Sequence, residues 1–210
     1  MEDPRLIDAL RAQGIRDEGV LGAMAALNRA DFLESDERPH AWRDEPLPIG
    51  ESQTISQPYV VARMTQAAAV RPGERVLEVG TGSGYQTAVL LGLGADVYTV
   101  ELRPVLAARA RTRLTHFFHE NLHLRVGDGW LGWPEAAPFD VILLTAAPEE
   151  IPQALLAQLG PGGRLVGPVG PSNAPQQLVR IVRHADGSFR TEELLAVRFV
   201  PMVRGGAPTG

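Results

Sequence analysis

Residues 75–85 read RVLEVGTGSGY, an apolar run followed by a turn with glycine at every second position. The apolar run is typical of a buried strand, and the residues from Tyr85 onward have the pattern of a helix. Glycines at such a turn let the backbone bend tightly and approach a ligand beside the positive end of the helix. The dinucleotide-binding fingerprint requires glycine at position 85, where this chain has Tyr85. The stretch therefore predicts a different ligand-binding turn, or a purely structural one.

Strand-like and helix-like segments alternate around this turn. Expected strands cover residues 75–80, 95–101, 122–127, 139–145 and 162–170, and expected helices begin at Pro58 and cover 85–93, 103–118 and 149–159. Two further strand-like runs, 176–184 and 189–200, are joined by a short turn, which is typical of an antiparallel hairpin. Such alternation predicts an α/β fold with a Rossmann-like, doubly wound, mostly parallel seven-stranded sheet and a C-terminal antiparallel hairpin.

The chain before this core is less regular. Apolar residues at helical spacing in residues 4–33 predict two short N-terminal helices, with Asp17 placed to cap the second. Residues 34–57 contain three prolines and follow neither a helical nor a strand period, so we expect a docked loop there. We expect the helices and this loop to cover the carboxyl edge of the sheet.

These segments predict a single domain over residues 1–203. It comprises the N-terminal helices and loop (1–57) and the Rossmann-like core (58–203), and residues 204–210 are expected to form a tail. A chain of 210 residues can bury a core of its own, so we expect a monomer.

Composition excludes several classes of chemistry. The chain has no cysteine and no lysine, which excludes thiolate nucleophiles, disulfides, cysteine-ligated metals, Schiff bases and the lysine of a phosphate-binding loop. A net charge of −5 disfavours nucleic acid and anionic membranes as partners. The N-terminus lacks the pattern of a secretory signal, and no apolar stretch approaches the ~20 residues of a membrane helix, so we expect a cytoplasmic protein.

Acidic residues follow successive expected strands. Glu101 ends the second strand, 21 positions after Gly80, and Asp128 follows the third. Because parallel strands end at one edge of the sheet, these carboxylates can meet the ribose hydroxyls and the adenine amino group of one nucleoside. Together with Glu78, two residues before the first glycine, this pattern resembles motif I of class I S-adenosylmethionine-dependent methyltransferases. In that motif, Glu78 would either accept a hydrogen bond from the ammonium group of the methionine moiety or orient the glycine turn.

A second stretch makes the resemblance more specific. LPIGESQTISQP at residues 47–58, followed by VARMT at 61–65, resembles the defining segment of protein-L-isoaspartate (D-aspartate) O-methyltransferases. Shorter matches extend the resemblance over about residues 5–202. The resemblance implies methyl transfer from S-adenosylmethionine to the free α-carboxylate of L-isoaspartyl and D-aspartyl residues in damaged proteins and peptides. S-adenosylhomocysteine would be the product, and no metal is implied.

The resemblance also implies site residues. Ser56 matches the active-site serine, which would contact the substrate. Implied cofactor-binding residues are Thr54, Ile55, Glu78, Gly80, Thr81, Gly82, Ser83, Gly84, Glu101, Leu102, Asp128, Gly129 and Thr145. Further implied substrate-binding residues are Ala146, Ala147 and Val200. A substrate carboxylate is already ionised at pH 7, so a serine that orients it suffices and no general base is required.

The chain departs from the family pattern at the expected loop. It has Gly50-Glu51-Ser52 where many members have Gly-x-Gly, and Trp42 where tyrosine is frequent. The loss of one glycine removes a flexible position and is expected to alter closure of the loop.

Several alternatives remain open at this stage. Ser56 precedes an expected helix and could act as its cap alone. Trp130 and Trp133 would be core or pocket wall, and the histidines at 116, 119 and 123 would be solvated or helix-terminal rather than metal ligands. Arg103, Arg109, Arg111 and Arg113 would form a solvated helix face, or a docking surface for acidic polypeptide. At the level of function, the alternatives are methylation of another carboxylate or small molecule, and cofactor binding without catalysis.

Overall fold

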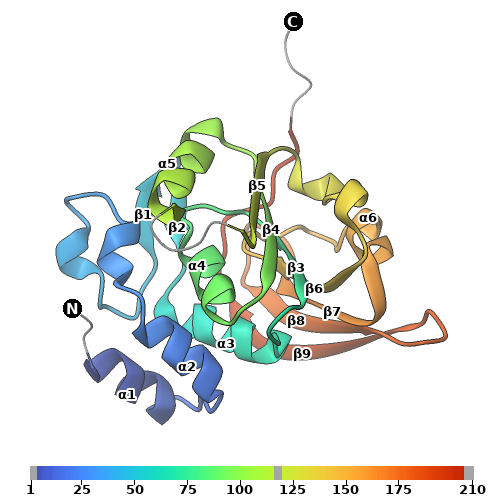
Figure 1. The fold of residues 1–210 in the computed structure, drawn as a ribbon, viewed down its shortest axis with the longest axis horizontal. Coiled ribbons are helices and arrows are strands. Elements are labelled where there is room, and N and C mark those ends of the chain that lie inside the picture. Colours follow the sequence, from blue (N-terminus) through green and yellow to red (C-terminus); the bar gives the residue numbers. More distant parts are fainter. Residues whose placement is uncertain (1–3, 116–119, 206–210) are drawn as a thin grey trace, which may run out of the picture.

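A seven-stranded sheet forms the centre of the computed structural model, which describes residues 4–115 and 120–205 (Figure 1). Its order is β5-β4-β3-β6-β7-β8-β9. The first five strands in this order are parallel, and β8 and β9 form an antiparallel hairpin at one edge. The strands are β3 (Arg75–Val79), β4 (Asp96–Glu101), β5 (Leu122–Val126), β6 (Phe139–Leu144), β7 (Leu159–Val169), β8 (Gln176–Arg183) and β9 (Phe189–Val197). The predicted fold class is therefore confirmed.

Helices cover both faces because the central strands are apolar on both sides. In β6, Val141 and Leu143 belong to one core cluster and Ile142 and Leu144 to the other, all with no exposed surface. The first cluster includes side chains of α3 (Pro58–Ala68), α4 (Tyr85–Gly92) and α5 (Pro104–Leu114). The second includes those of α6 (Gln153–Ala157). This arrangement leaves the carboxyl edge of the sheet for loops.

Two N-terminal helices pack outside this layer, as Figure 1 shows. α1 (Pro4–Ala12) contacts α2 (Glu18–Ala25), and both contact α3. Asp17 caps α2 as predicted, since its side chain accepts a hydrogen bond from the Val20 amide at 3.1 Å. The expectation that these helices cover the carboxyl edge is wrong, because α2 packs at Gly19 and Ala23 against the end of α4, which leads into the start of β4 at the opposite edge of the sheet.

The expected loop at 34–57 contains regular structure. After the short 3-10 helices at Arg29–Phe32 and Arg38–His40, the strands β1 (Leu47–Gly50) and β2 (Gln53–Ile55) form an antiparallel hairpin. The hairpin lies beside α5 in Figure 1 and reaches the carboxyl edge of the sheet. Burial alternates along β1, but a strand of only four residues is too short for a clear period.

Some boundaries differ from the prediction. α6 begins at Gln153 rather than 149, because Ile151 precedes Pro152 and is disfavoured in the helical conformation. β7 begins at Leu159 rather than 162, and β9 ends at Val197 rather than 200. α5 ends at Leu114, and residues 116–119, with two of the three histidines considered above, lie outside the described residues.

The chain after β9 stays attached to the sheet. The Ala147 amide donates to the Val200 carbonyl at 2.9 Å, and the Met202 amide donates to the Ala147 carbonyl at 2.8 Å. Arg204 stacks over the Trp130 ring at 4.4 Å, although it was expected to begin a tail. Within the described residues, no helix is both long and apolar enough to span a membrane.

Candidate functional site

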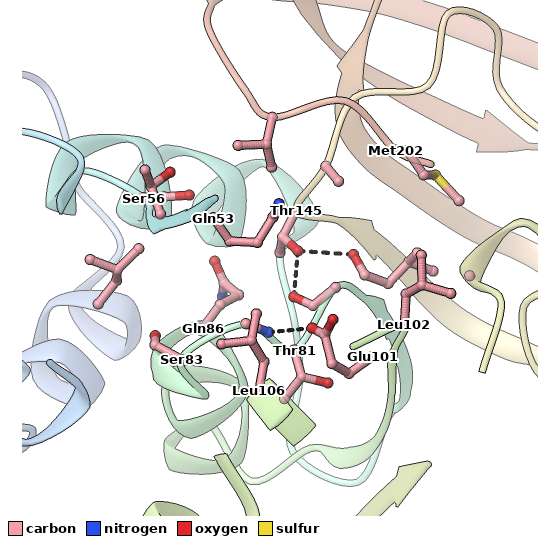
Figure 2. A pocket seen from close by; sticks show the side chains of 18 of the residues that line it. Gln53, Ser56, Thr81, Ser83, Gln86, Glu101, Leu102, Leu106, Thr145 and Met202 are labelled. Atoms are coloured by element: carbon pink, nitrogen blue, oxygen red, sulfur yellow. Dashed lines mark hydrogen bonds between the residues drawn. The ribbon is translucent and has the colours of Figure 1, made fainter. Parts of the chain in front are cut away.

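A pocket of about 900 Å³, its open mouth included, lies at the carboxyl edge of the sheet. The segments around it follow β2, β3, β4 and β6 and include the chain after β9. Figure 2 shows Glu101 and Leu102 on one side of the pocket and Ser56, Ser83 and Gln86 on the other. The pocket therefore has two chemically different sides, and the glycine turn spans them, with Thr81 on the side of Glu101 and Ser83 on the side of Gln86 (Figure 2).

The glycine turn is held against the end of β6. Gly80 has a φ of +99°, and a Cβ there would lie 2.3 Å from the Thr145 Oγ1. That hydroxyl donates to the Val79 carbonyl at 2.9 Å (Figure 2). Only glycine meets both the backbone and the packing requirements at position 80. Gly84 faces away from the pocket, toward the side chain of Leu114 in α5.

Glu101 stands at the end of β4 with its carboxylate on the pocket wall. One oxygen accepts from the Gly82 amide at 2.8 Å, and the other accepts from the Arg103 amide at 2.9 Å. Each carboxylate oxygen has more than one acceptor position, so both can also receive hydroxyl donors. This arrangement suits the paired hydroxyls of a ribose.

Glu78 lies behind the glycine turn and not in the pocket. It has no exposed surface, and its Oε2 accepts from the hydroxyls of Thr87 at 2.5 Å and Thr99 at 2.7 Å. Burial raises the Glu78 pKa to about 8, against the opposing effect of these two hydrogen bonds. Thr99 donates its single hydroxyl proton to Glu78. The Thr99 oxygen therefore accepts a hydrogen bond from the Thr81 hydroxyl in the turn, at 2.6 Å. Of the two roles considered for Glu78, the geometry favours orientation of the turn over direct contact with a ligand.

Ser56 lines the pocket together with Gln53, Thr54 and Ile55 from the hairpin. It does not cap α3: the N-cap position is Gln57, which makes no side-chain capping bond, and Pro58 follows at the first turn. The interpretation of Ser56 as a helix cap is therefore wrong. Its hydroxyl is available to a ligand in the pocket.

A buried arginine that the sequence analysis did not single out holds this segment in place. Arg29 has no exposed surface, and its guanidinium donates to the carbonyls of Ala41, Glu45 and Ser56, the last two at 3.1 Å. Burial lowers the Arg29 pKa to about 10, so the group stays charged at pH 7. No periodic pattern marks Arg29 in the sequence, because its partners are main-chain atoms far along the chain.

The arginines of the basic stretch attach the N-terminal segment to the core. Arg113 in α5 pairs with Glu34 at 2.9 Å and donates to the Ser83 carbonyl at 3.4 Å. Arg103, at the pocket wall, pairs with Glu51 of the hairpin turn at 3.6 Å. The expectation of a simply solvated face is wrong for these side chains, because they join segments that lie far apart in sequence.

Two other expected site residues also lie outside the pocket lining. Asp128 accepts from the Trp130 amide at 2.9 Å and caps the 3-10 helix Gly129–Leu131, so its contact with an adenine stays a prediction. Ala147 anchors the chain after β9 through the backbone bonds described above. Trp130 also holds the chain after β9, since its indole N–H donates to the Met202 carbonyl at 3.1 Å.

The remaining expected residues do line the pocket: Thr54, Ile55, Ser56, Gly80, Thr81, Gly82, Ser83, Glu101, Leu102, Gly129, Thr145, Ala146 and Val200. The sequence analysis did not assign the following lining residues: Gln53, Val61, Met64, Val79, Tyr85, Gln86, Val100, Arg103, Leu106, Pro201, Met202 and Val203. Most are apolar and adjoin the quoted motifs, so their proximity to those motifs was the available signal.

The described residues contain no group of three histidine, cysteine, aspartate or glutamate side chains able to hold a metal ion. His123 lies on β5, where its Nε2 is 3.0 Å from Asp96 Oδ1 and its ring stacks on Tyr98 with a centroid separation of 4.3 Å. His123 therefore contributes to the packing between β5 and β4.

Comparison with known sequences gives consistent matches. The profile of a family described as protein-L-isoaspartate (D-aspartate) O-methyltransferase matches residues 1–207. A relative from Anaeromyxobacter dehalogenans, described as a protein-L-isoaspartate O-methyltransferase, is 58% identical over 190 residues, which cover 90% of this chain and 91% of that protein. A Myxococcus xanthus protein with the same description is 56% identical and covers 93% of each chain.

Comparison with solved structures agrees. A structure described as a protein-L-isoaspartate O-methyltransferase has a TM-score of 0.85 and 28% identity, over 94% of this chain and 64% of that one. A second, from Plasmodium falciparum and in complex with S-adenosyl-L-homocysteine, has a TM-score of 0.83 and 23% identity, over 95% of this chain and 97% of that one. At 23% identity, the similarity to this second structure is evidence for a shared fold only.

Proposed function

Because this chain belongs to the protein-L-isoaspartate (D-aspartate) O-methyltransferase family, we propose that it methylates the free α-carboxylate of L-isoaspartyl and, secondarily, D-aspartyl residues in damaged proteins and peptides. S-adenosylmethionine is the methyl donor and S-adenosylhomocysteine the product. The observation that carries the proposal is that Ser56 and the glycine turn after β3 face one pocket. A nucleoside site and a substrate-orienting hydroxyl are thereby within reach of one another.

The pocket fits the donor in its chemistry. Glu101 offers carboxylate oxygens to the ribose, and Leu102, Leu106 and Met202 offer apolar surface to the adenine. The bound donor supplies a methyl group on a positively charged sulfur. Thr81, Gly82 and Ser83 line the pocket and would hold the donor through the backbone of the turn.

The chain contributes orientation and exclusion of water. A substrate carboxylate is ionised at pH 7, so the side chains have no proton to remove. Ser56 would donate a hydrogen bond to one oxygen of the substrate carboxylate and leave the other oxygen free to accept the methyl group. Ile55, Ala146 and Val200 line the pocket and contribute apolar surface that excludes water. Alignment of the reacting atoms and removal of solvent can each contribute several kcal/mol.

Incubation with radiolabelled S-adenosylmethionine and matched isoaspartyl and aspartyl peptides tests this function. We expect label in the isoaspartyl peptide and not in its aspartyl counterpart. Labelling of other carboxylates or of a small molecule instead would support a different methyltransferase. Cofactor binding without any transfer would support a non-catalytic binding protein.

We further propose that the enzyme works as a monomer in the cytoplasm, with no nucleic acid or membrane partner. A chain of 210 residues can bury a core of its own, the net charge is −5, and the absence of cysteine suits a reducing compartment. Light scattering after size-exclusion chromatography should give one chain mass, 22.7 kDa. A mass of two chains at micromolar concentration would contradict the monomer.

A further inference from the structure

A buried amide in the pocket wall has no part in the function as described so far. Gln86 stands in the first turn of α4, is 7% exposed and lines the pocket. Figure 2 shows it on the same side as Ser56 and Ser83, opposite Glu101. Its side chain contacts Thr65 of α3, and the apolar residues Val61 and Met64 of the same helix also line the pocket. A polar group in such surroundings requires a hydrogen-bond partner for each end.

A chain of hydrogen bonds sets the orientation of this amide. The Thr65 hydroxyl donates its single proton to the Val61 carbonyl at 2.8 Å. It can therefore only accept from Gln86, whose Nε2 lies 3.0 Å away. The amide nitrogen of Gln86 faces α3 for this reason. Its Oε1, which can only accept, is left to the pocket.

We propose that Gln86 Oε1 accepts a hydrogen bond from the α-ammonium group of S-adenosylmethionine and of its product. This assignment rests on the proposed function and adds the residue that recognises the amino-acid end of the donor. Glu101 marks the ribose end, and the glycine turn runs from Thr81 on that side to Ser83 on the side of Gln86 (Figure 2). The amino-acid portion of the donor therefore extends toward Gln86.

The surroundings of Gln86 support an ammonium donor. Glu78, the other acceptor considered for this group, is fully buried behind the turn. Gln86 thus provides a neutral acceptor at the end of the pocket where Glu78 does not reach. A neutral acceptor there holds a cationic ammonium without placing another negative charge near the anionic carboxylate of the substrate.

Binding calorimetry with two ligands tests the assignment independently of catalysis. S-adenosylhomocysteine carries the amino-acid end, whereas 5′-methylthioadenosine lacks it and keeps the nucleoside. Gln86→Met retains the side-chain length without an acceptor. We expect it to weaken S-adenosylhomocysteine binding by about 10- to 100-fold, the scale of one hydrogen bond to a charged group, and to leave methylthioadenosine binding unchanged. Gln86→Glu, which keeps an acceptor, should retain the affinity.

Two controls separate direct contact from structural effects. Thr65→Val removes the group that orients the amide and should weaken S-adenosylhomocysteine binding by less than Gln86→Met does. On the wild type and Gln86→Glu, the desamino analogue of S-adenosylhomocysteine should bind at least tenfold more weakly than the parent, which tests the contact even if Gln86→Met does not fold.

Three results would overturn the assignment to Gln86 without affecting the proposed function. They are an equal loss of affinity for both ligands in Gln86→Met, no loss for either ligand, and a desamino analogue that binds as tightly as S-adenosylhomocysteine. A wild type that binds neither nucleoside would overturn the proposed function, and this assignment with it.

Discussion

At the scale of single residues, replacement of Ser56 tests whether this serine orients the substrate carboxylate or has a structural role. Its hydroxyl does not cap α3, so Ser56→Ala should change stability little. We expect methylation of an isoaspartyl peptide to fall by about 10- to 1000-fold, as for loss of one positioned donor, with S-adenosylhomocysteine affinity nearly unchanged. Steady-state kinetics and calorimetry measure the two effects, and Ser56→Thr serves as the variant that keeps a hydroxyl. Full activity in Ser56→Ala would contradict the assignment.

Glu78 gives a second prediction at this scale. Burial raises its pKa from 4.5 to about 8, so between these values the folded protein holds a proton that the unfolded chain has released. The free energy of unfolding should therefore fall as pH rises through this window, by at most about 1.4 kcal/mol per pH unit. Above about pH 8, this contribution becomes constant.

Glu78→Gln removes the titration and keeps the acceptor for Thr87 and Thr99. We expect the variant to lack this part of the pH dependence, so that its stability relative to the wild type increases between pH 5 and pH 8.5. Denaturant unfolding across this range measures the difference. Parallel curves for the two proteins would show that Glu78 has an ordinary pKa in the folded state.

At the scale of elements, the β1–β2 hairpin carries strain in its turn. Glu51 and Ser52 have φ values of +53° and +56°, the left-handed region that glycine and asparagine adopt most easily. Ser52 is exposed, and its carbonyl accepts from the Gln53 side chain, a contact that does not depend on the serine side chain. The departure from Gly-x-Gly noted in the sequence therefore occurs at a position where glycine fits the backbone better.

Ser52→Gly should stabilise the protein by about 0.5–1 kcal/mol, because relief of left-handed strain exceeds the added entropy of the unfolded chain. Denaturant midpoints measure this change. Ser52→Ala is the matched control, since it removes the hydroxyl and keeps the strain. A glycine variant no more stable than the alanine variant would contradict the role of backbone strain.

At the scale of the whole molecule, Arg29 joins the N-terminal segment to the active-site loop. Its guanidinium satisfies main-chain carbonyls at Ala41, Glu45 and Ser56. Arg29→Met keeps an apolar stem and leaves these acceptors without their donor, so we expect a loss of at least about 2 kcal/mol in unfolding free energy. Arg29→Lys, which retains a charged donor, should recover part of it. Chemical denaturation of both variants measures the effect, and a change below about 0.5 kcal/mol in Arg29→Met would refute it.

Apolar periodicity and glycine placement were sufficient to determine the sheet, its covering helices and the position of the ligand-binding edge. These features depend on local sequence, because a buried strand such as Phe139–Leu144 is mostly apolar whatever its partners are. The turn at Gly80 and the acid at Glu101 could be assigned to one site for the same reason, since parallel strands end together.

Only the tertiary structure decided which polar groups face the pocket and which support it. Glu78 and Glu101 are both acids at the ends of strands, yet one is buried behind the turn and the other lines the pocket. Arg113 and Glu34 lie 79 residues apart, and Gln86 is oriented by Thr65, 21 residues away. Periodicity reports whether a side chain points inward, but the pairing of buried polar groups depends on how separate elements pack, and no local pattern encodes that.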